Sequence, residues 1–542
     1  MWKPSLLCNR RRHDANKTLV PHVLPSTSLR VNFANVDTPP KLSTFRLTFP
    51  SCRRFLFPML RLRLFAACLL LPSTFVFAQT APPNPLASYI RVNDPVILLE
   101  HVSVIDGTGA APLADQSILI DHGKIKAVGP GASIQTPTGA KVLDLSGHTV
   151  IPGLVGMHEH LFYVEPGNAA LHALAGTEMM ETGPRLYLAA GITTARTTGS
   201  IEPYTDLNIK HDIDTGLAPG PDFDVTSPYL DGPGTIIPMN HQLTSAADAT
   251  NAVNYWAGEG ITSFKAYQYI TPEELKASID ATHAHGLKIT GHLCSIGFTE
   301  AADMGIDNLE HGIGVDTEFY SKKQPGVCPG QGPPMQEMAA KLDMNSAPVM
   351  AMIHDLVQHH VAVTSTLSVF ESLGPNGPPM AFLMREQGPM MPQAWASVLL
   401  IRAQIAEHAS ASPVPVALKK EMQFEREFVA AGGLLMAGCD PTGYGAILPG
   451  FGDQRNLELL VEAGFTPVQA IQIATLNGAK YLGRDKQIGS IAAGKQADLV
   501  VLKADPSKDI HNIESVETVF KNGVGYDSQA LIDSTRGMVG IR

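Results

Sequence analysis

Several short apolar runs in the middle of the chain each end in a polar residue of a kind that binds metal ions. In the first run, residues 153–160, His158 and His160 stand two apart, so in a strand both imidazoles project from one face while Glu159 projects from the other. Four later runs follow the same pattern and end in Lys265, His292, His311 and Asp440. The pattern predicts that five strands bring these six side chains to one point.

The same region alternates apolar strands with amphipathic stretches, which is typical of an α/β protein with a parallel sheet. Seven further strands are predicted at residues 191–197, 222–230, 260–267, 287–293, 306–312, 361–370 and 433–440. Eight strands with helical connections predict a (β/α)8 TIM-like barrel over residues 151–485. Catalytic residues of such barrels lie at the C-terminal ends of the strands, which is where the six polar residues stand.

Two β-rich segments flank this region. Residues 79–150 and 486–542 contain short β-type runs separated by turn residues, and they predict a small β-sandwich split into two parts. Within the barrel region, residues 318–425 exceed what a connection needs, which predicts a lid-like insertion. Its methionines suit an adaptable apolar wall, and a contact between subunits of a homo-oligomer is the alternative. These methionines are Met380, Met384, Met390 and Met391.

The amino-terminal part is basic, whereas the rest of the chain is acidic. The first 78 residues hold 12 Lys and Arg against 2 Asp and Glu, so the formal charge of −11 for the chain leaves −21 on the remainder. Such an acidic body argues against nucleic acid and anionic membrane surfaces as partners. With 542 residues, 44% of them hydrophobic and 17% charged, the chain is expected to be globular with a large core.

Residues 59–78 have the organisation of a secretory signal peptide. A basic start is followed by an apolar stretch and by a small-residue cleavage site before Gln79. This predicts export to the periplasm or the extracellular space through a Sec-type signal, with no membrane span left after cleavage; an uncleaved anchor is the alternative. Residues 1–58 are interpreted as a disordered extension from a wrongly chosen start codon or as an organellar transit peptide.

Only three cysteines follow the proposed cleavage site, namely Cys294, Cys328 and Cys439. Such a sparse and odd-numbered set predicts no disulfide framework. By strand alternation Cys439 is expected to point away from the polar cluster and to pack in the core.

An ordered series of motifs makes the chain resemble the amidohydrolase superfamily over most of residues 96–525. The series runs through VIPGLVGMHEHLF at residues 150–162, then FKAY, GHL, EHG and CDP, then residues 465–483 and 488–502. In that superfamily the segments before and after the barrel join into a β-sandwich, which the resemblance implies here too.

Lys265 indicates the binuclear branch of the superfamily. An ammonium beside two divalent cations is repelled by several kcal/mol at an effective dielectric constant of about 20, so this lysine is not expected to remain a bare cation. The resemblance implies that it reacts with carbon dioxide and forms a carbamate that bridges both metals. Imidazolonepropionase-like members have a similar overall sequence pattern but lack this lysine. Its presence therefore favours a resemblance to the prolidase-like enzymes, which have it. A lysine pointing out of the barrel is the alternative.

The resemblance also implies a division of the ligands between two metal ions. His158, His160 and Asp440 would bind the more buried ion, His292 and His311 the more exposed one, and carbamylated Lys265 would join them. Such ligands suit zinc, with cobalt, manganese or iron as alternatives. Two ions would convert a bridging water into hydroxide near neutral pH, and Asp440 is expected to pass its proton to the leaving group.

Three further residues are candidates for substrate binding. Tyr229 and Tyr267 would offer hydroxyl groups to an oxyanion or to a substrate carboxylate, and Arg196 would pair with a carboxylate. Each is equally well explained as a residue of the barrel rim that is tied to the backbone. His283 and His285 stand just before a strand and are interpreted as structural.

Together these inferences predict a metal-dependent hydrolase that cleaves a carbon–nitrogen bond of a small molecule. An amide or peptide bond is favoured, in a substrate such as a dipeptide or an N-acyl amino acid. The alternative is a cyclic amide, lactone or phosphotriester hydrolase on the same two-metal site. A non-catalytic scaffold is a further alternative, against which the complete set of six ligands argues.

Overall fold

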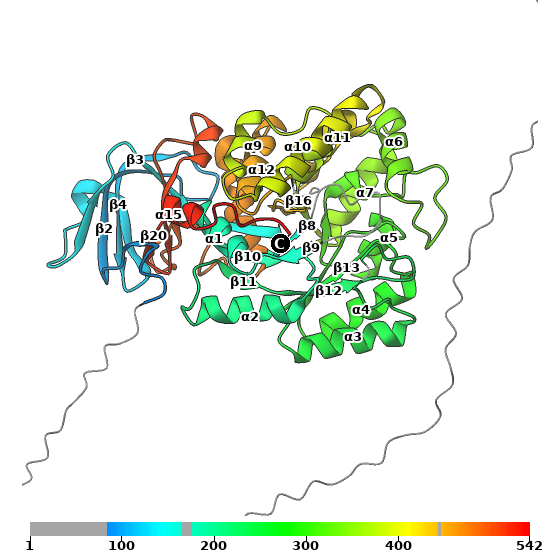
Figure 1. Cartoon of the computed structure of the whole chain (residues 1–542), viewed down its shortest axis with the longest axis horizontal. Coiled ribbons are helices and arrows are strands. Elements are labelled where there is room, and N and C mark those ends of the chain that lie inside the picture. The colour runs from blue at the N-terminus through cyan, green and yellow to red at the C-terminus, as the bar shows by residue number, and fades with distance from the viewer. Residues whose placement is uncertain (1–83, 165–175, 238, 443–445, 542) are drawn as a thin grey trace, which may run out of the picture. The chain divides into compact units, whose positions relative to one another are not determined.

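The computed structural model describes residues 84–164, 176–237, 239–442 and 446–541 (Figure 1). The predicted extension 1–58 and the predicted signal peptide 59–78 therefore lie outside the described residues. Among the described helices, none combines the length and the apolar composition that a membrane crossing requires.

The two segments that flank the barrel share one sheet of nine strands. Strand β18 (Leu499–Leu502) runs antiparallel to β6 (Thr149–Pro152), and this pairing joins the carboxyl-terminal strands to the amino-terminal ones. The other strands are β1 (Ile90–Val92), β2 (Val96–Val104), β3 (Leu113–Asp121), β4 (Lys124–Pro130), β5 (Lys141–Asp144), β19 (Val516–Lys521) and β20 (Val524–Asp527). A separate apolar core with contributions from both segments stabilises this sheet, which agrees with the split small domain expected from the sequence.

Eight parallel strand positions follow one another in chain order, as a (β/α)8 barrel requires. One ladder holds β7 (Leu154–Glu159), β10 (Ile192–Thr197) and β11 (Asp222–Asp224). The other holds β12 (Thr226–Leu230), β13 (Ser263–Ala266), β14 (Lys288–Gly291), β15 (Asn308–Glu310), β16 (Ala362–Ser365) and β17 (Leu435–Ala437). Only Val225 separates β11 from β12, so the two together correspond to the single strand predicted at residues 222–230. The backbone N–H of Asp440 donates to the carbonyl of His158 at 2.9 Å, which links the last strand to the first.

Helices connect the strands and lie outside them. In Figure 1, α3 and α4 lie side by side below β12 and β13. Helix α4 begins where the sequence signals a start, because Thr271 and Glu274 form a capping box around Pro272. The helices of the barrel are α1 (Thr182–Ala189), α2 (Pro203–Asp214), α3 (Ala246–Gly258), α4 (Pro272–Ala284), α5 (Phe298–Met304), α7 (Ala347–Gln358), α11 (Val414–Ala430), α12 (Phe451–Glu462), α13 (Pro467–Gln472) and α14 (Gly478–Tyr481).

The seventh predicted strand is shorter than the sequence suggested. The expected strand 361–370 ends at Ser365, and helix α8 (Leu367–Ser372) follows it. Every residue from 361 to 370 is buried. Because all of these residues are buried, the run shows neither the alternation of a half-buried strand nor the period of an amphipathic helix, which explains the error.

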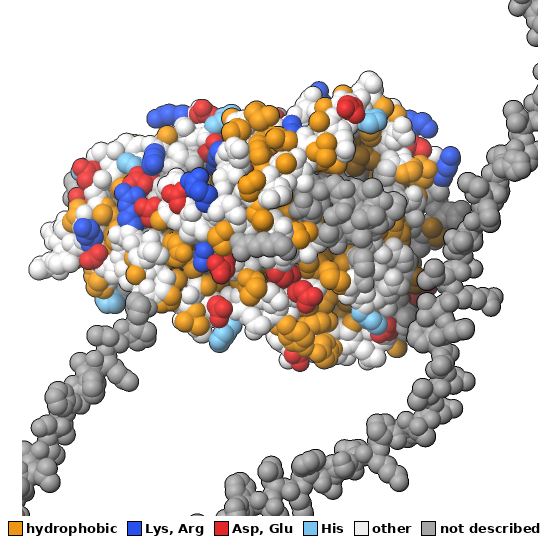
Figure 2. Space-filling model, in the orientation of Figure 1, with side chains coloured by type: hydrophobic (Ala, Val, Ile, Leu, Met, Phe, Trp, Pro, Cys, Tyr) orange, Lys and Arg blue, Asp and Glu red, His pale blue; other side chains and the backbone are white. Residues whose placement is uncertain are grey.

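The predicted lid 318–425 is too long, because α7, β16 and α11 of the barrel lie within it. The additional elements are α6 (Gly332–Lys341), α9 (Met380–Glu386) and α10 (Pro392–Glu407). Met380 and Met384 are exposed, whereas Met390 and Met391 pack in a core cluster with Phe382. None of the four methionines lines the cavity described below, so the predicted methionine wall is wrong. Figure 2 shows apolar side chains gathered over α9 and α10.

A disulfide joins Cys294 to Cys328, contrary to the prediction from the cysteine count. Cys294 lies two residues beyond His292, and Cys328 lies just before α6. The bond therefore ties the segment that enters α6 to the end of β14. Lys323 strengthens this connection by donating to the carbonyls of Cys294 and Ser295 at 2.7 and 2.6 Å.

Candidate metal centre

All six predicted ligand residues line one cavity of about 250 Å³ at the C-terminal ends of the barrel strands. Five of them stand in or directly after β7, β13, β14 and β15, and Asp440 stands three residues after β17. A larger hollow of about 580 Å³ lies at the opposite ends of the strands, near Asp222, Ser263 and Lys288, and none of the six reaches it. The smaller cavity is therefore the candidate site.

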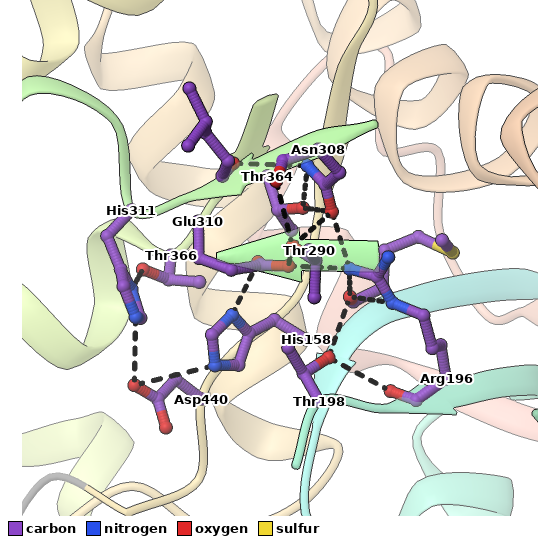
Figure 3. A network of polar contacts seen from close by, with 12 residues as sticks. His158, Arg196, Thr198, Thr290, Asn308, Glu310, His311, Thr364, Thr366 and Asp440 are labelled. Atoms are coloured by element: carbon purple, nitrogen blue, oxygen red, sulfur yellow. Dashed lines mark hydrogen bonds and ion pairs between the residues drawn. The ribbon is translucent and has the colours of Figure 1, made fainter. Parts of the chain in front are cut away.

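The carboxylate of Asp440 lies among three imidazoles, of which Figure 3 shows those of His158 and His311. Its oxygens are 3.3 Å from His160 Nε2, 3.8 Å from His158 Nε2 and 3.9 Å from His311 Nε2. The fourth imidazole, His292, lies with its ring centre 4.5 Å from that of His311. The structure thus brings together residues that are up to 282 positions apart in the sequence.

Hydrogen bonds behind the rings turn the Nε2 atoms towards the centre. His160 Nδ1 lies 3.0 Å from the carbonyl of Gly199, which can only accept, so Nδ1 carries the proton and Nε2 is free. His158 Nδ1 contacts Glu310 Oε2 at 2.7 Å, and His311 Nδ1 contacts Thr366 Oγ1 at 2.7 Å. Contacts of this kind orient histidines that bind metal ions.

Two ligand candidates have buried nitrogen atoms without a partner among the described residues. These atoms are Lys265 Nζ and His292 Nε2; the Lys265 side chain is almost fully buried, whereas His292 is partly exposed but keeps its Nε2 atom buried. Buried polar groups without partners are rare in folded proteins and point to an ion or a water molecule. The donor set therefore fits divalent metal ions, because it offers nitrogen and carboxylate ligands that are already directed at one small space.

Burial keeps the nitrogen ligands close to the form that binds metals. It lowers the pKa of His158 to about 4 and holds the pKa of His292 and His311 well below 6.5. It also lowers the pKa of Lys265 to about 8, although Glu310 and Asp440 oppose that shift. Burial raises the pKa of Asp440, but the surrounding histidines outweigh it and hold that pKa well below the usual range. Asp440 is therefore anionic and the imidazoles of His158, His292 and His311 are neutral, as metal ligation requires.

Two of the candidates have a backbone conformation that is rare outside glycine. His311 has a φ of 68° and Asp440 a φ of 48°. By strand alternation Glu310 and His311 would face opposite sides, yet both side chains reach the cluster because the left-handed residue breaks the alternation. At the end of β17, Asp440 faces the site while Cys439 contacts Glu159 behind it at 3.2 Å, as strand alternation predicted for Cys439.

Arg196 is not at the cavity, so the prediction that it binds a substrate carboxylate is wrong. Its side chain is fully buried below the histidines and donates to the carbonyl of Met157, to Asn308 and, at 2.8 Å, to Glu310. The guanidinium does pair with a carboxylate, but with an internal one. A polar residue near the end of a strand can also point into the barrel interior below the site. The sequence does not show how deep in the barrel its side chain lies.

Glu310 is a residue of this site that the sequence reasoning missed. It accepts from His158, Arg196 and Thr290 and is completely buried (Figure 3). Burial raises its pKa, but Lys265, His158 and Arg196 outweigh burial and hold the pKa well below 4.5. The sequence does place this glutamate directly before His311. Strand alternation predicts that the two neighbouring side chains point to opposite faces, so Glu310 was not expected at the site.

The remaining candidates fall into two groups. Tyr229 and Tyr267 line the cavity, with ring centres 4.7 Å apart. His283 and His285 lie away from it and contact Asp307 and Asn254 at 2.9 and 2.8 Å, which agrees with their interpretation as structural residues.

The sequence of the chain matches the model of the amidohydrolase family over residues 149–524, which is more than half of its length. The chain belongs to the amidohydrolase family. Members of this family hydrolyse carbon–nitrogen bonds with the help of metal ions, and the chain is accordingly a metal-dependent hydrolase of such bonds.

Three similar proteins give the extent of the likeness to other amidohydrolases. An imidazolonepropionase from Geobacillus kaustophilus is 23% identical over 450 residues, which cover 77% of this chain and 94% of that protein. A dihydroorotase from Pelobacter propionicus is 31% identical over 110 residues, or 20% of this chain and 23% of that one. The crystal structure of a Xaa-Pro dipeptidase with bound methionine superposes with a TM-score of 0.58 at 20% identity, covering 80% of this chain and all of the other. This likeness supports the barrel fold with an additional domain.

Proposed function

We propose that the chain binds two divalent metal ions, most suitably zinc, and hydrolyses an amide bond of a small substrate. Three Nε2 atoms around the carboxylate of Asp440, in a cavity that also holds the partnerless nitrogens of Lys265 and His292, support this proposal. In this assignment His158, His160 and Asp440 hold one ion, and His292 and His311 hold the other.

Lys265 would complete the ligand set as a carbamate. Its Nζ is buried without a partner among the described residues, and its pKa of about 8 leaves a share of neutral amine at neutral pH. The neutral amine would add to carbon dioxide and release one N–H proton to solvent, and the resulting carbamate anion would stand beside the metals in place of an ammonium cation.

Bound metal ions supply an activated water molecule and polarise the substrate carbonyl. Asp440 then serves as the group that accepts the proton of the water and donates it to the leaving amine. Thr442 donates to Asp440 Oδ1 at 2.8 Å and so holds the carboxylate in place. The hydroxyls of Tyr229 and Tyr267 lie in the cavity wall and would donate to the oxygen of the tetrahedral intermediate.

Export from the cytoplasm is part of the proposal. The disulfide between Cys294 and Cys328 supports it, because disulfides persist mainly in oxidising compartments. Amino-terminal sequencing of the protein recovered outside the cytoplasm should begin at Gln79; a chain that retains residues 59–78 would contradict cleavage.

The test combines metal analysis with one substitution. The purified protein is expected to contain close to two metal ions per chain, and Lys265→Ala is expected to lose activity and to regain part of it with short carboxylic acids. Lys288→Ala is the control, because Lys288 stands at the opposite end of the adjacent strand and donates to the carbonyl of Tyr481. Full activity of Lys265→Ala, or loss of activity in the control alone, would refute the two-metal assignment.

A panel of amides, cyclic amides, lactones and a phosphotriester identifies the reaction. Turnover of amides alone is the expected result. Turnover of lactones or phosphotriesters alone would favour the alternative on the same ligands, and metal below one ion per chain without any hydrolysis would favour a scaffold.

A further inference from the structure

Beyond the six ligand residues, every described side chain that lines the candidate cavity is uncharged. Most of this wall is apolar and comes from several separate elements, namely β8 (Phe162–Val164), the segment after β12, the end of the 3-10 turn Gly312–Gly314, α6 and α8. Representative residues are Phe162, Ile237, Val315, Met335, Phe370 and Leu373. The substrate must therefore place its groups against an apolar surface.

No arginine lines the cavity within the described part of the chain, and Lys265 is the only lysine that does. The internal segments left out of that description, residues 165–175, 238 and 443–445, contain neither Lys nor Arg. Arg196, the nearest candidate from the sequence, is bound by Glu310 below the histidines. A carboxylate of the substrate that lies beyond the metals would thus lose water without gaining a cationic partner, which is unfavourable.

The polar groups of the wall are suited to neutral ligands. Tyr229, Tyr267, Gln331 and Thr442 offer hydroxyl and amide groups that form hydrogen bonds without carrying charge. Hydrogen bonds of this kind match the oxygen and nitrogen atoms of an amide or carbamate. A few polar groups on a mainly apolar wall orient a ligand without requiring a charge on it.

We infer that the substrate is an uncharged amide with apolar groups on both sides of the scissile bond and with no free carboxylate. The inference rests on the proposed hydrolase function and narrows it. Free dipeptides and N-acyl amino acids, which the sequence favoured, carry a carboxylate and are therefore poor substrates. Met335 on α6 and Phe370 on α8 are two of the apolar wall residues that a substrate carboxylate would face in place of a cation.

The experiment compares two substrates that differ only in the carboxylate. N-benzoylphenylalanine and N-benzoylphenethylamine contain the same scissile amide, and kcat/KM of each is measured with the metal-loaded protein. The neutral compound is expected to be hydrolysed at least about tenfold more efficiently, since the charge must be desolvated against an apolar wall. The variant Met335→Arg is expected to shift the ratio towards the carboxylate substrate, whereas the neutral control Met335→Gln is not.

The outcomes separate the inference from the function on which it rests. Preference for the carboxylate substrate in the wild-type protein would overturn the inference and leave the hydrolase intact. An unchanged ratio in Met335→Arg, with both substrates still cleaved, would remove the role assigned to this part of the wall. Turnover of neither compound nor any other amide by protein with two bound metals would overturn the proposed function and the inference with it.

Discussion

Replacement of Glu310 by glutamine tests whether the buried carboxylate sets the proton position on His158. Glu310 Oε2 accepts from His158 Nδ1 at 2.7 Å and therefore keeps the proton on Nδ1 and the lone pair on Nε2. After Glu310→Gln, an amide NH2 facing the ring would demand the opposite tautomer and place the proton on Nε2. If the amide turned the other way, its NH2 group would meet Arg196, which can only donate.

Two magnitudes follow from this geometry. Loss of a hydrogen-bonded carboxylate behind a metal-binding histidine typically lowers metal affinity by about 10- to 100-fold. The substitution also leaves the guanidinium of Arg196 buried without a counter-charge, which typically costs about 3–5 kcal/mol of stability. The free energy of unfolding of the metal-free protein should therefore fall by an amount of that order.

The assay measures metal content against a buffered series of free zinc concentrations and unfolding by urea in the presence of a chelator. Glu386→Gln is the matched control, because Glu386 is also fully buried but lies away from the cavity and accepts from the backbone N–H of Leu448. A double-mutant cycle with Arg196→Met separates the charge effect from the effect on His158. A folded Glu310→Gln variant with the zinc affinity of the parent would refute the reasoning about the tautomer.

Three further predictions concern stability and the shape of the site. Cys328→Ser should lower the free energy of unfolding by about 4 kcal/mol, as chain entropy gives for a sequence separation of 34; equal urea midpoints for variant and parent under oxidising conditions would contradict this. Burial raises the pKa of Glu386 from 4.5 to about 8, so the folded state binds the carboxyl proton more tightly than the unfolded state does. The contribution of this group to the free energy of unfolding is therefore present below pH 4.5 and is lost as pH rises towards 8. The difference in unfolding free energy between parent and Glu386→Gln should therefore shift in favour of the variant across this range, and a pH-independent difference would count against it. Gly438→Ala should weaken zinc binding, because the added Cβ would stand 2.3 Å from the backbone nitrogen of His158. Gly258→Ala is the control and should leave zinc binding unchanged, because no heavy atom lies within 4 Å of its new Cβ. Equal zinc affinity for both variants would show that the backbone at Gly438 accommodates the methyl group.

The order of the barrel strands was predictable from the sequence because each strand carries its own local signal. Apolar runs of strand length alternate with amphipathic stretches. The split small domain was predictable because short β-type runs separated by turn residues flank the barrel region on both sides. The error at Thr366–Phe370 arose because these residues are buried throughout, so their pattern does not distinguish a strand from a helix. The lid was overestimated because the amphipathic segments that form α7 and α11 of the barrel were counted with the additional helices α6, α9 and α10.

The candidate ligands were predictable because a histidine pair and four single residues stand at strand ends, and parallel strands of a barrel bring those ends together. Their supporting residues were not predictable in the same way. Glu310 reaches the cluster only because His311 adopts a positive φ, and Arg196 meets Glu310 only because their strands lie across the same barrel interior. Cys294 and Cys328 pair because a loop returns to the end of β14, and no count of cysteines contains that path.

The sequence by itself therefore determined the kinds of element, their order and the residue types at their ends, because these depend on neighbours along the chain. Only the tertiary structure decided which nitrogen faces the centre, which charge is neutralised internally and what the cavity wall is made of. These properties depend on distances between residues far apart in the chain, such as His158 and Glu310, and on the burial that changes their proton affinities.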